Sequence, residues 1–405
     1  MSRESLSFQS SRSSTRNQAL ECERRRDCVS PGAGTWRFGG QKLPWIGLIL
    51  CLLLSGCGAG PDCGGVARAL DLCSTLPTVK IGLVAPFEGR YRNLGYEVLY
   101  AVKLAVRERN AAGGVAGYMV ELVALDDGED PDARRFLARK FAVDEQVMGV
   151  VGPFAADSLY EVASAYQEVG LPLITPATCP SSGSGASGQA FCLGAGIETV
   201  AETLAQAVPG DAQAVVLRSS RVGWDSWVDY LPGAAWKVRT SEDWRTASAD
   251  CYLYEGDVLA AAELLSEMRG TGVNAPLFGG PMLARTQLSQ IAGDAVRGAC
   301  YAMTAPLYAD QALSFTPGYQ ELSGGTPGPW AALAYDASVL LLDALEREIA
   351  SLGRPTREGV SVALAEARGP DGELVFEGRR RRQAEMTLYC YQANESYPGS
   401  ATPRR

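Results

Sequence analysis

Short apolar segments alternate with helical patterns along most of this 405-residue chain, and this alternation constrains the fold more than any other sequence feature. The first segment, 79–85, is almost continuously apolar, as expected for a parallel strand that is covered on both faces. Further strands are predicted at 120–125, 147–151 and 171–174, with apolar residues at helical spacing between them. Strands that alternate with helices predict a parallel sheet with helices on both faces.

The same alternation resumes after a Gly/Ser-rich stretch at 181–188. Strands are predicted at 214–217, 251–254, 276–278 and 298–305, and helices at 198–207, 258–269 and 330–349. Segments 373–376 and 386–391 are expected to form a terminal hairpin, with Arg379–Arg382 at its solvated tip. The fold class is therefore α/β with two parallel sheets. Because ligands of open α/β sheets bind beyond the carboxyl ends of the strands, the pattern predicts a cleft between two lobes.

Composition excludes several classes of function. Hydrophobic residues make up 46% and charged residues 20%, which is an ordinary globular balance. The formal net charge of −9 disfavours nucleic acid as a partner, since little positive charge is available to displace phosphate counterions. The chain has 0 histidines, which excludes Ser-His-Asp and Cys-His nucleophiles and His-ligated zinc. We expect a protein without enzyme activity, cofactor or metal, although chemistry based on carboxylates, lysine or a carboxylate-bound metal stays open.

The segment before the first predicted strand has the layout of a secretory signal. Arg37 and Lys42 precede an apolar run at 43–54, which is shorter than the ~20 residues that cross a bilayer. The tetrapeptide Leu54–Cys57 resembles a bacterial lipobox, so Cys57 is expected to carry lipid and to anchor the exported protein to a membrane. A plain signal peptide that contains a cysteine is the alternative. We therefore assign 1–57 to an extension with a signal peptide and 58–77 to a tether.

Cysteine usage agrees with export, since disulfides persist outside the cytosol. After Cys57 the chain has an odd number of cysteines, which predicts disulfides with one thiol left over. The nearest pairs, Cys63 with Cys73 and Cys179 with Cys192, would each close a short loop. The pairing of the others stays open; they are Cys251, Cys300 and Cys390.

Some sequence patterns resemble functional motifs, but their context indicates structural roles. The letters GSGASG at 183–188 match a dinucleotide fingerprint, yet no helix starts directly after them, which predicts a surface loop. The acidic group at 126–130 lacks the spacing of a calcium loop and predicts a solvated strand end, with Asp130 capping the next helix. Asp157 is likewise expected to cap a helix. Most of the tryptophans between 224 and 244 are expected in the core or on the surface.

Several collinear segments together resemble the periplasmic branched-chain amino-acid-binding proteins of ABC transporters. The segments are KIGLVAPFEG (80–89), NAAGGVAG (110–117), VELVALDDGEDP (120–131), VMGVVGP (147–153), LPLITPAT (171–178), IAGDAVRGACYAMTAP (291–306), AYDASVLLLDAL (334–345) and GPDGELVFEG (369–378). The resemblance covers 78 to about 392. It implies the type I periplasmic-binding fold, in which two Rossmann-like lobes are joined by three crossover strands and close on a solute.

The resemblance also implies the domain boundaries and the partners. Lobe 1 is expected at 78–194 and 303–369, and lobe 2 at 195–302 and 370–398. The protein is expected to be an extracytoplasmic monomer that binds a small solute and hands it to ABC permease subunits. A ligand sensor for a membrane receptor is a second hypothesis, and an exported carboxylate-based enzyme is a third.

In this family the loops after the third and fourth strands hold the ligand, which places Asp157, Ser158 and Thr178 at the site. Asp157 suits a ligand ammonium, and the helix N-terminus beside it suits a carboxylate. Asp257 on the other lobe is expected to hold a second cationic group, and aromatic residues are expected to cover the apolar part. The ligand is then a small amino acid or related amine, with a modest preference for an extra positive or polar group. The predicted ligand-binding residues are Phe87, Tyr91, Ala155, Asp157, Ser158, Thr178, Trp224 and Asp257.

Overall fold

The structure is a computed structural model that describes residues 76–128, 131–181, 188, 190–219, 226–233, 236–246, 248–308, 312–392 and 402–403. All of these residues lie in one compact unit of the chain, Thr75–Arg405. Within them, no helix is long and apolar enough to span a membrane. Several sequence predictions concern residues outside this description: the signal and lipobox with Cys57, the cysteines Cys63 and Cys73, the cap Asp130, most of the GSGASG stretch, and Trp224.

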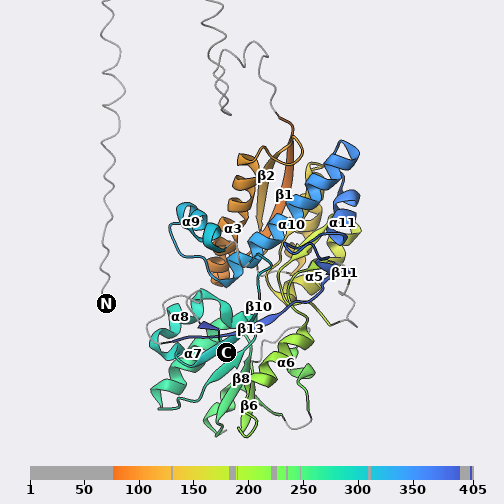
Figure 1. Ribbon diagram of the computed structural model, residues 1–405. Helices are drawn as coiled ribbons and strands as arrows, with labels where there is room; N and C mark the ends of the chain where they lie inside the picture. Colours follow the sequence, from red (N-terminus) through yellow and green to blue (C-terminus); the bar gives the residue numbers. More distant parts are fainter. Residues whose placement is uncertain are drawn as a thin grey trace, which may run out of the picture. The chain divides into compact units, whose positions relative to one another are not determined.

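The first sheet has seven strands in the order β11-β12-β5-β4-β3-β1-β2 (Figure 1). Neighbouring strands are parallel except β11 and β12, which pair antiparallel. The predicted strands of the first half are all present, within about two residues of the expected ends. The bounds are β1 Thr78–Ala85, β2 Met119–Asp126, β3 Val147–Val151, β4 Leu173–Thr175, β5 Phe191–Cys192, β11 Phe376–Glu377 and β12 Arg380–Arg381.

Helices cover both faces of this sheet, which explains why β1 is apolar on both sides. Ile81 of β1 lies in the same core cluster as residues of α3 and α10, whereas Val84 lies in a second cluster with residues of α4 and α5. α3 packs against α10, and α4 packs against α5. The helices of this part are α3 Arg92–Ala111, α4 Pro131–Val143, α5 Ala156–Glu168, α9 Ala312–Ser323, α10 Pro329–Leu352 and α11 Arg357–Ala365.

The second sheet also has seven strands, in the order β14-β13-β10-β9-β8-β6-β7. β6 to β10 form its parallel part, and β13 joins β10 antiparallel. The strands are β6 Ala214–Arg218, β7 Lys237–Thr240, β8 Cys251–Glu255, β9 Leu277–Gly279, β10 Ala299–Thr304, β13 Met386–Cys390 and β14 Thr402–Pro403, and the α-helices are α6 Ile197–Ala207, α7 Val258–Gly270 and α8 Thr286–Ala292. Short 3-10 helices lie at η1 Gly89–Tyr91, η2 Trp227–Tyr230, η3 Ser241–Arg245, η4 Pro281–Ala284 and η5 Gly293–Val296.

The chain passes between the two sheets three times: after β5, after β10 and after β12. The passing segments contact one another. The N–H of Ala195 donates to Oγ1 of Thr304 at 2.9 Å, and the N–H of Ala305 donates to the carbonyl of Glu385 at 2.8 Å. The expected fold, two Rossmann-like sheets joined by three crossings, is confirmed.

The predicted terminal hairpin is wrong. β11 pairs with β12, whereas β13 pairs with β10 of the other sheet, so segments 373–376 and 386–391 are not partners. The expected boundary at 370 also differs from the structure, because the strands within 376–381 hydrogen-bond in the first sheet. The chain therefore makes its last passage after β12.

Arg379–Arg382 is consequently not a solvated tip. Nη1 of Arg381 donates to the carbonyl of Ala305 at 2.7 Å, within the passing segments. Burial lowers the pKa of Arg381, although Asp336 raises it. Arg380 lies 3.5 Å from the carboxylate of Glu198 on α6. Arg380 and Arg381 thus connect the last passage of the chain to α6 and to the passage after β10.

The described residues form two disulfides. The predicted pair Cys179–Cys192 is confirmed, and Cys300–Cys390 is a second bond that links β10 to β13. Cys251 is buried and is not disulfide-bonded.

Candidate ligand-binding site

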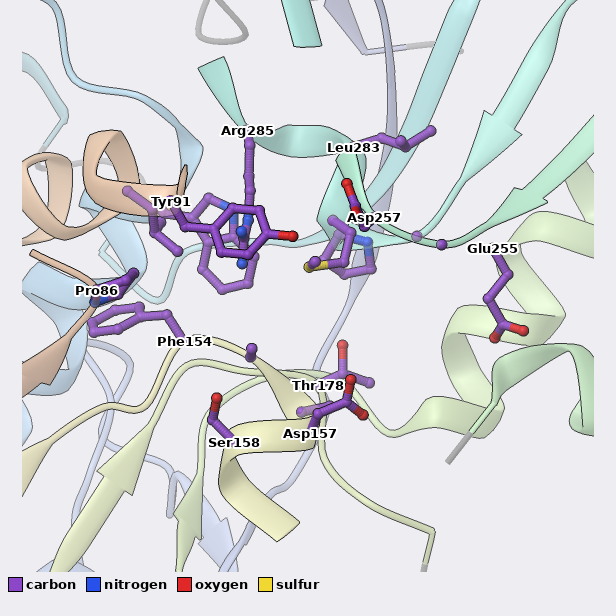
Figure 2. A pocket seen from close by; sticks show the side chains of 18 of the residues that line it. Pro86, Tyr91, Phe154, Asp157, Ser158, Thr178, Glu255, Asp257, Leu283 and Arg285 are labelled. Carbon is purple, nitrogen blue, oxygen red and sulfur yellow. The ribbon is translucent and has the colours of Figure 1, made fainter. Parts of the chain in front are cut away.

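A cavity of about 540 Å³ lies where the carboxyl ends of strands from both sheets meet. Its walls come from the segments that follow β1, β2, β3 and β4 of the first sheet and β8 and β9 of the second. Figure 2 shows Asp157, Ser158 and Thr178 facing Asp257 and Arg285 across the open space. This position is the one where open α/β sheets bind their ligands.

The segment after β1 is held in place by close backbone contacts. Oδ1 of Asp126, at the end of β2, accepts the N–H groups of Phe87 at 2.6 Å and Glu88 at 3.1 Å. Gly95 of α3 lies so close to this segment that a Cβ would be 2.0 Å from the carbonyl oxygen of Pro86. These contacts fix the position of Tyr91, which is the N-cap residue of α3 and lines the cavity.

The segment after β3 leads directly into α5. Gly152 has φ +109°, and a Cβ there would lie 2.2 Å from the carbonyl oxygen of Val84, so only glycine fits. Ala155 is the N-cap residue of α5 and has no side-chain cap. Asp157 lies in the first turn, so the prediction that Asp157 is the cap is wrong. The first-turn N–H groups of a helix lack intrahelical acceptors, and here the residues of that turn line the cavity.

On the second sheet, acidic residues at the cavity already have partners. Asp257 is the N-cap of α7, and its Oδ1 accepts from the N–H of Leu259 at 2.7 Å and of Ala260 at 3.2 Å. Oε2 of Glu255 lies 3.1 Å from Nε of Arg218 and accepts from Ser226 at 2.6 Å. Burial raises the pKa of Glu255, against the effects of the Ser226 hydrogen bond and of Arg218. Both carboxylates therefore bind groups of the protein that form the wall of the site.

Asp127 follows β2 and lines the cavity, but it is not the solvated residue that the acidic segment predicted. Its exposed fraction is 7%, and burial raises its pKa to about 6, although Arg134 and Arg285 lower it. The nearby Glu161 is paired with Arg134 at 2.6 Å. Asp127 thus carries a proton-sensitive carboxyl at the edge of the cavity.

The structure brings most of the predicted ligand-binding residues together. Those that line the cavity are Tyr91, Ala155, Asp157, Ser158, Thr178 and Asp257. Phe87 does not line it; its ring packs edge-on against Tyr96, with 6.2 Å between centroids. Trp224 lies outside the described residues.

Sequence reasoning missed two tryptophans and an arginine. Trp227 and Trp330 supply indole rings to the cavity, and Trp330 packs edge-on against Phe154. Arg285 precedes α8 and has an exposed fraction of 3%, and its guanidinium lies 4.7 Å from the centre of the Tyr91 ring. Tryptophans in the 224–244 region gave a weak signal for Trp227. No local pattern marks Arg285, because its burial depends on residues distant in sequence.

The described residues contain no group of three or more Asp, Glu or Cys side chains arranged to hold a metal ion. The chemistry that the cavity offers is hydrogen bonding, charge and aromatic contact.

Comparisons with known proteins agree with this geometry. The arrangement of sheets is that of type I periplasmic binding proteins: the leucine-binding protein LivK of Thermotoga maritima superimposes with a TM-score of 0.69 at 21% identity, over 81% of this chain and 98% of that one. Residues 78–226 match the sequence model of the periplasmic binding protein family. The resemblance to branched-chain amino-acid-binding proteins is thereby confirmed.

Curated relatives match over shorter stretches. An amino acid binding protein of Pseudomonas aeruginosa is 31% identical over 101 residues, 25% of this chain and 27% of that protein. The Leu/Ile/Val-binding protein homolog 2 of Brucella abortus is 34% identical over 138 residues, 34% of this chain and 33% of that protein. The chain thus aligns with about a third or less of the length of these two relatives. Both are named for binding and not for a reaction, in agreement with the expectation that this chain is not an enzyme.

Proposed function

We propose that this chain is an extracytoplasmic solute-binding lipoprotein that captures a small polar solute, an amino acid or a related amine, for an ABC importer. The observation that carries the proposal is the cavity of about 540 Å³ between the carboxyl ends of two sheets that are joined by three passages of the chain. Binding sites for small molecules have volumes of roughly 300–1,000 Å³ and combine apolar walls with a few polar groups. The named relatives bind amino acids, which supports the same class of ligand here.

The polar groups of the first sheet suit an amino acid. Ser158 and the first-turn N–H groups of α5 favour an anionic group, and Thr178 adds a hydroxyl. The carboxylate of Asp157 favours an ammonium group. The aromatic rings of Tyr91 and Trp227 cover apolar parts of the solute.

The proposal is tested by purifying the protein natively and analysing by mass spectrometry the solute that denaturation releases. We expect one small polar solute, unchanged on incubation, that rebinds in calorimetry with one site per chain. Asp157→Asn should weaken its binding at least tenfold, since a buried charged hydrogen bond is lost. A strain that lacks the gene should lose high-affinity uptake of the same solute. Conversion of the solute to a product would instead favour an enzyme.

Lipid anchoring at Cys57 is the finer part of the proposal and concerns residues outside the described structure. The lipobox-like tetrapeptide and the preceding apolar run support it. Cells fed a clickable fatty acid should label the wild type and leave Cys57→Ala unlabelled, whereas Cys51→Ala, a matched change inside the apolar run, should keep the label. Label retained by Cys57→Ala would contradict the anchor.

A further inference from the structure

Arg285 is a buried charged side chain of the cavity wall that forms no salt bridge and no hydrogen bond with the described residues. Its exposed fraction is 3%, and neither Nε nor Nη1 has a hydrogen-bond partner. The guanidinium faces the Tyr91 ring, and the carboxylates of Asp127, Asp257 and Glu97 act on it only through space. Figure 2 shows Arg285 extending from the start of α8 toward Tyr91.

Other half-buried arginines of this protein have structural roles, in which the guanidinium donates hydrogen bonds to backbone carbonyls. Arg269 donates to the carbonyls of Val273 at 2.7 Å and Arg297 at 3.0 Å. Arg357 donates to three carbonyls, including that of Val147 at 2.8 Å. Arg285 is more deeply buried than either, yet its donors have no such acceptors. A structural explanation of Arg285 therefore lacks the contacts that the other arginines make.

Leaving a charged donor buried and unpaired is strongly unfavourable. Burial lowers the pKa of Arg285, but a guanidinium stays charged at neutral pH. The group therefore needs an acceptor, and the cavity that it lines is where one can enter. Trp330 lines the same cavity, and its indole N–H is likewise buried without a partner. Both groups are donors only, so the partner of each must be an acceptor.

We propose that Arg285 forms an anion subsite, and that the solute carries a carboxylate that this guanidinium binds. The planar fork of an arginine matches the two oxygens of a carboxylate, and the pair is strong when it is desolvated. The inference rests on the proposed function, because it names the chemical class of the captured solute. It also changes the expected preference: a free cation in the wall favours an acidic group, where the sequence alone predicted an additional positive group.

Two sources of the carboxylate are distinguished by matched probes. L-leucine and L-leucinamide differ at the main carboxylate, and L-glutamate and L-glutamine differ at the side-chain carboxylate. Calorimetry should show the wild type binding the acid of at least one pair 100-fold or more tightly than its amide. The pair that shows this difference identifies which carboxylate is bound, and loss of the difference in Arg285→Met assigns that carboxylate to Arg285.

Variants test the residue itself. Arg285→Met should reduce affinity for the preferred acid at least 100-fold, and Arg285→Lys, which keeps the charge but not the fork, about tenfold. Arg245→Met is the matched control, because Arg245 is exposed, is paired with Glu267 on the surface of the second sheet and should leave affinity unchanged. Without solute, Arg285→Met should melt at the same temperature as the wild type or higher, since it removes an unpaired buried charge. A merely structural arginine would lower the melting temperature when replaced.

The outcomes separate this inference from the proposed function. If Arg285→Met binds the preferred acid within threefold of the wild type, the anion subsite is wrong while the binding function stands. If the wild type binds none of the four probes but releases a solute without an acidic group, the inference is again overturned alone. If it binds no probe and releases no solute, both the inference and the proposed function fail.

Discussion

Asp157 and Asp257 lie near the starts of two helices at the same cavity, yet the structure gives them different tasks. Asp257 is an N-cap whose carboxylate accepts two backbone N–H groups, whereas Asp157 lies one step inside its helix, beyond an alanine cap. In sequence the two positions look alike, because an acidic residue is favoured both at the cap and in the first turn. The distinction rests on the extended backbone of Ala155, which no single residue type reveals.

Because Asp257 is an N-cap, we expect its oxygen acceptor, and not its negative charge, to stabilise the protein. Asp257→Ala should lower the free energy of unfolding by about 1 kcal/mol, because the N–H groups of Leu259 and Ala260 lose their acceptor. Asp257→Asn, which removes the charge but keeps an oxygen, should stay within about 0.5 kcal/mol of the wild type. Urea unfolding of the three proteins measures this. Equal losses for alanine and asparagine would show that the charge, and not the cap, stabilises the helix.

At the scale of elements, the long helix α10 begins at a buried carboxylate. Oε1 of Glu97, on α3, accepts from the N–H of Trp330 at 2.9 Å and of Ala331 at 3.1 Å. The preceding Gly328 leaves room for this carboxylate, since a Cβ there would lie 2.4 Å from Oε1. Burial raises the pKa of Glu97 from 4.5 to about 7, although both N–H donors and Arg285 lower it.

This carboxyl predicts a pH dependence with a definite sign. The folded state binds the proton of Glu97 more tightly than the unfolded state, so the stabilisation is complete below pH 4.5 and is lost as the pH rises to 7. The advantage of the wild type over Glu97→Gln should fall by roughly 3 kcal/mol across this window. Urea unfolding of both proteins at intervals from pH 4.5 to 8 tests the sign. A difference that stays constant with pH would contradict it.

Sequence patterns predicted where the strands lie more accurately than which strands pair with each other. The continuous apolar character of segments such as 79–85 and 147–151 reflects burial on both faces, which is a local property of a strand between helix layers. The partner of β13 is not a local property: two adjacent strand-like segments suggested a hairpin, but each joins a different sheet. The same distinction applies to the candidate site. The sequence predicted the cavity residues that directly follow strands, but it did not reveal Arg285, because only the folded chain buries that side chain.

At the scale of the whole molecule, the two disulfides of the described residues lie beside the passages between the sheets. Cys192 ends the last strand before the first passage, and Cys390 belongs to the strand that follows the third. Peptide mapping without reduction should recover the pairs Cys179–Cys192 and Cys300–Cys390, with Cys251 as a free thiol. Any other pairing among these five cysteines would contradict the structure.

The two bonds should also differ in their contribution to stability. They span sequence separations of 13 and 90 residues, and the chain-entropy model gives about 3 kcal/mol for short loops and about 4–5 kcal/mol for long ones. We therefore expect Cys300→Ser/Cys390→Ser to lose more free energy of unfolding than Cys179→Ser/Cys192→Ser. Urea unfolding at one pH, with the wild type as reference, compares them. A larger loss from the shorter loop would mean that strain or residual structure outweighs chain entropy.

Each sheet contains a strand from late in the chain, and this has a consequence for biosynthesis. β12 completes the pairing of β5, and β13 covers β10, and both come from 380–390, close to the end of the described chain. Multidomain chains commonly fold from the N-terminus while the ribosome is still working. Here neither sheet can be completed before residues 380–390 have been made. Nascent chains that stop before Arg380 should therefore remain sensitive to protease in both halves, whereas chains that extend past Cys390 should become resistant.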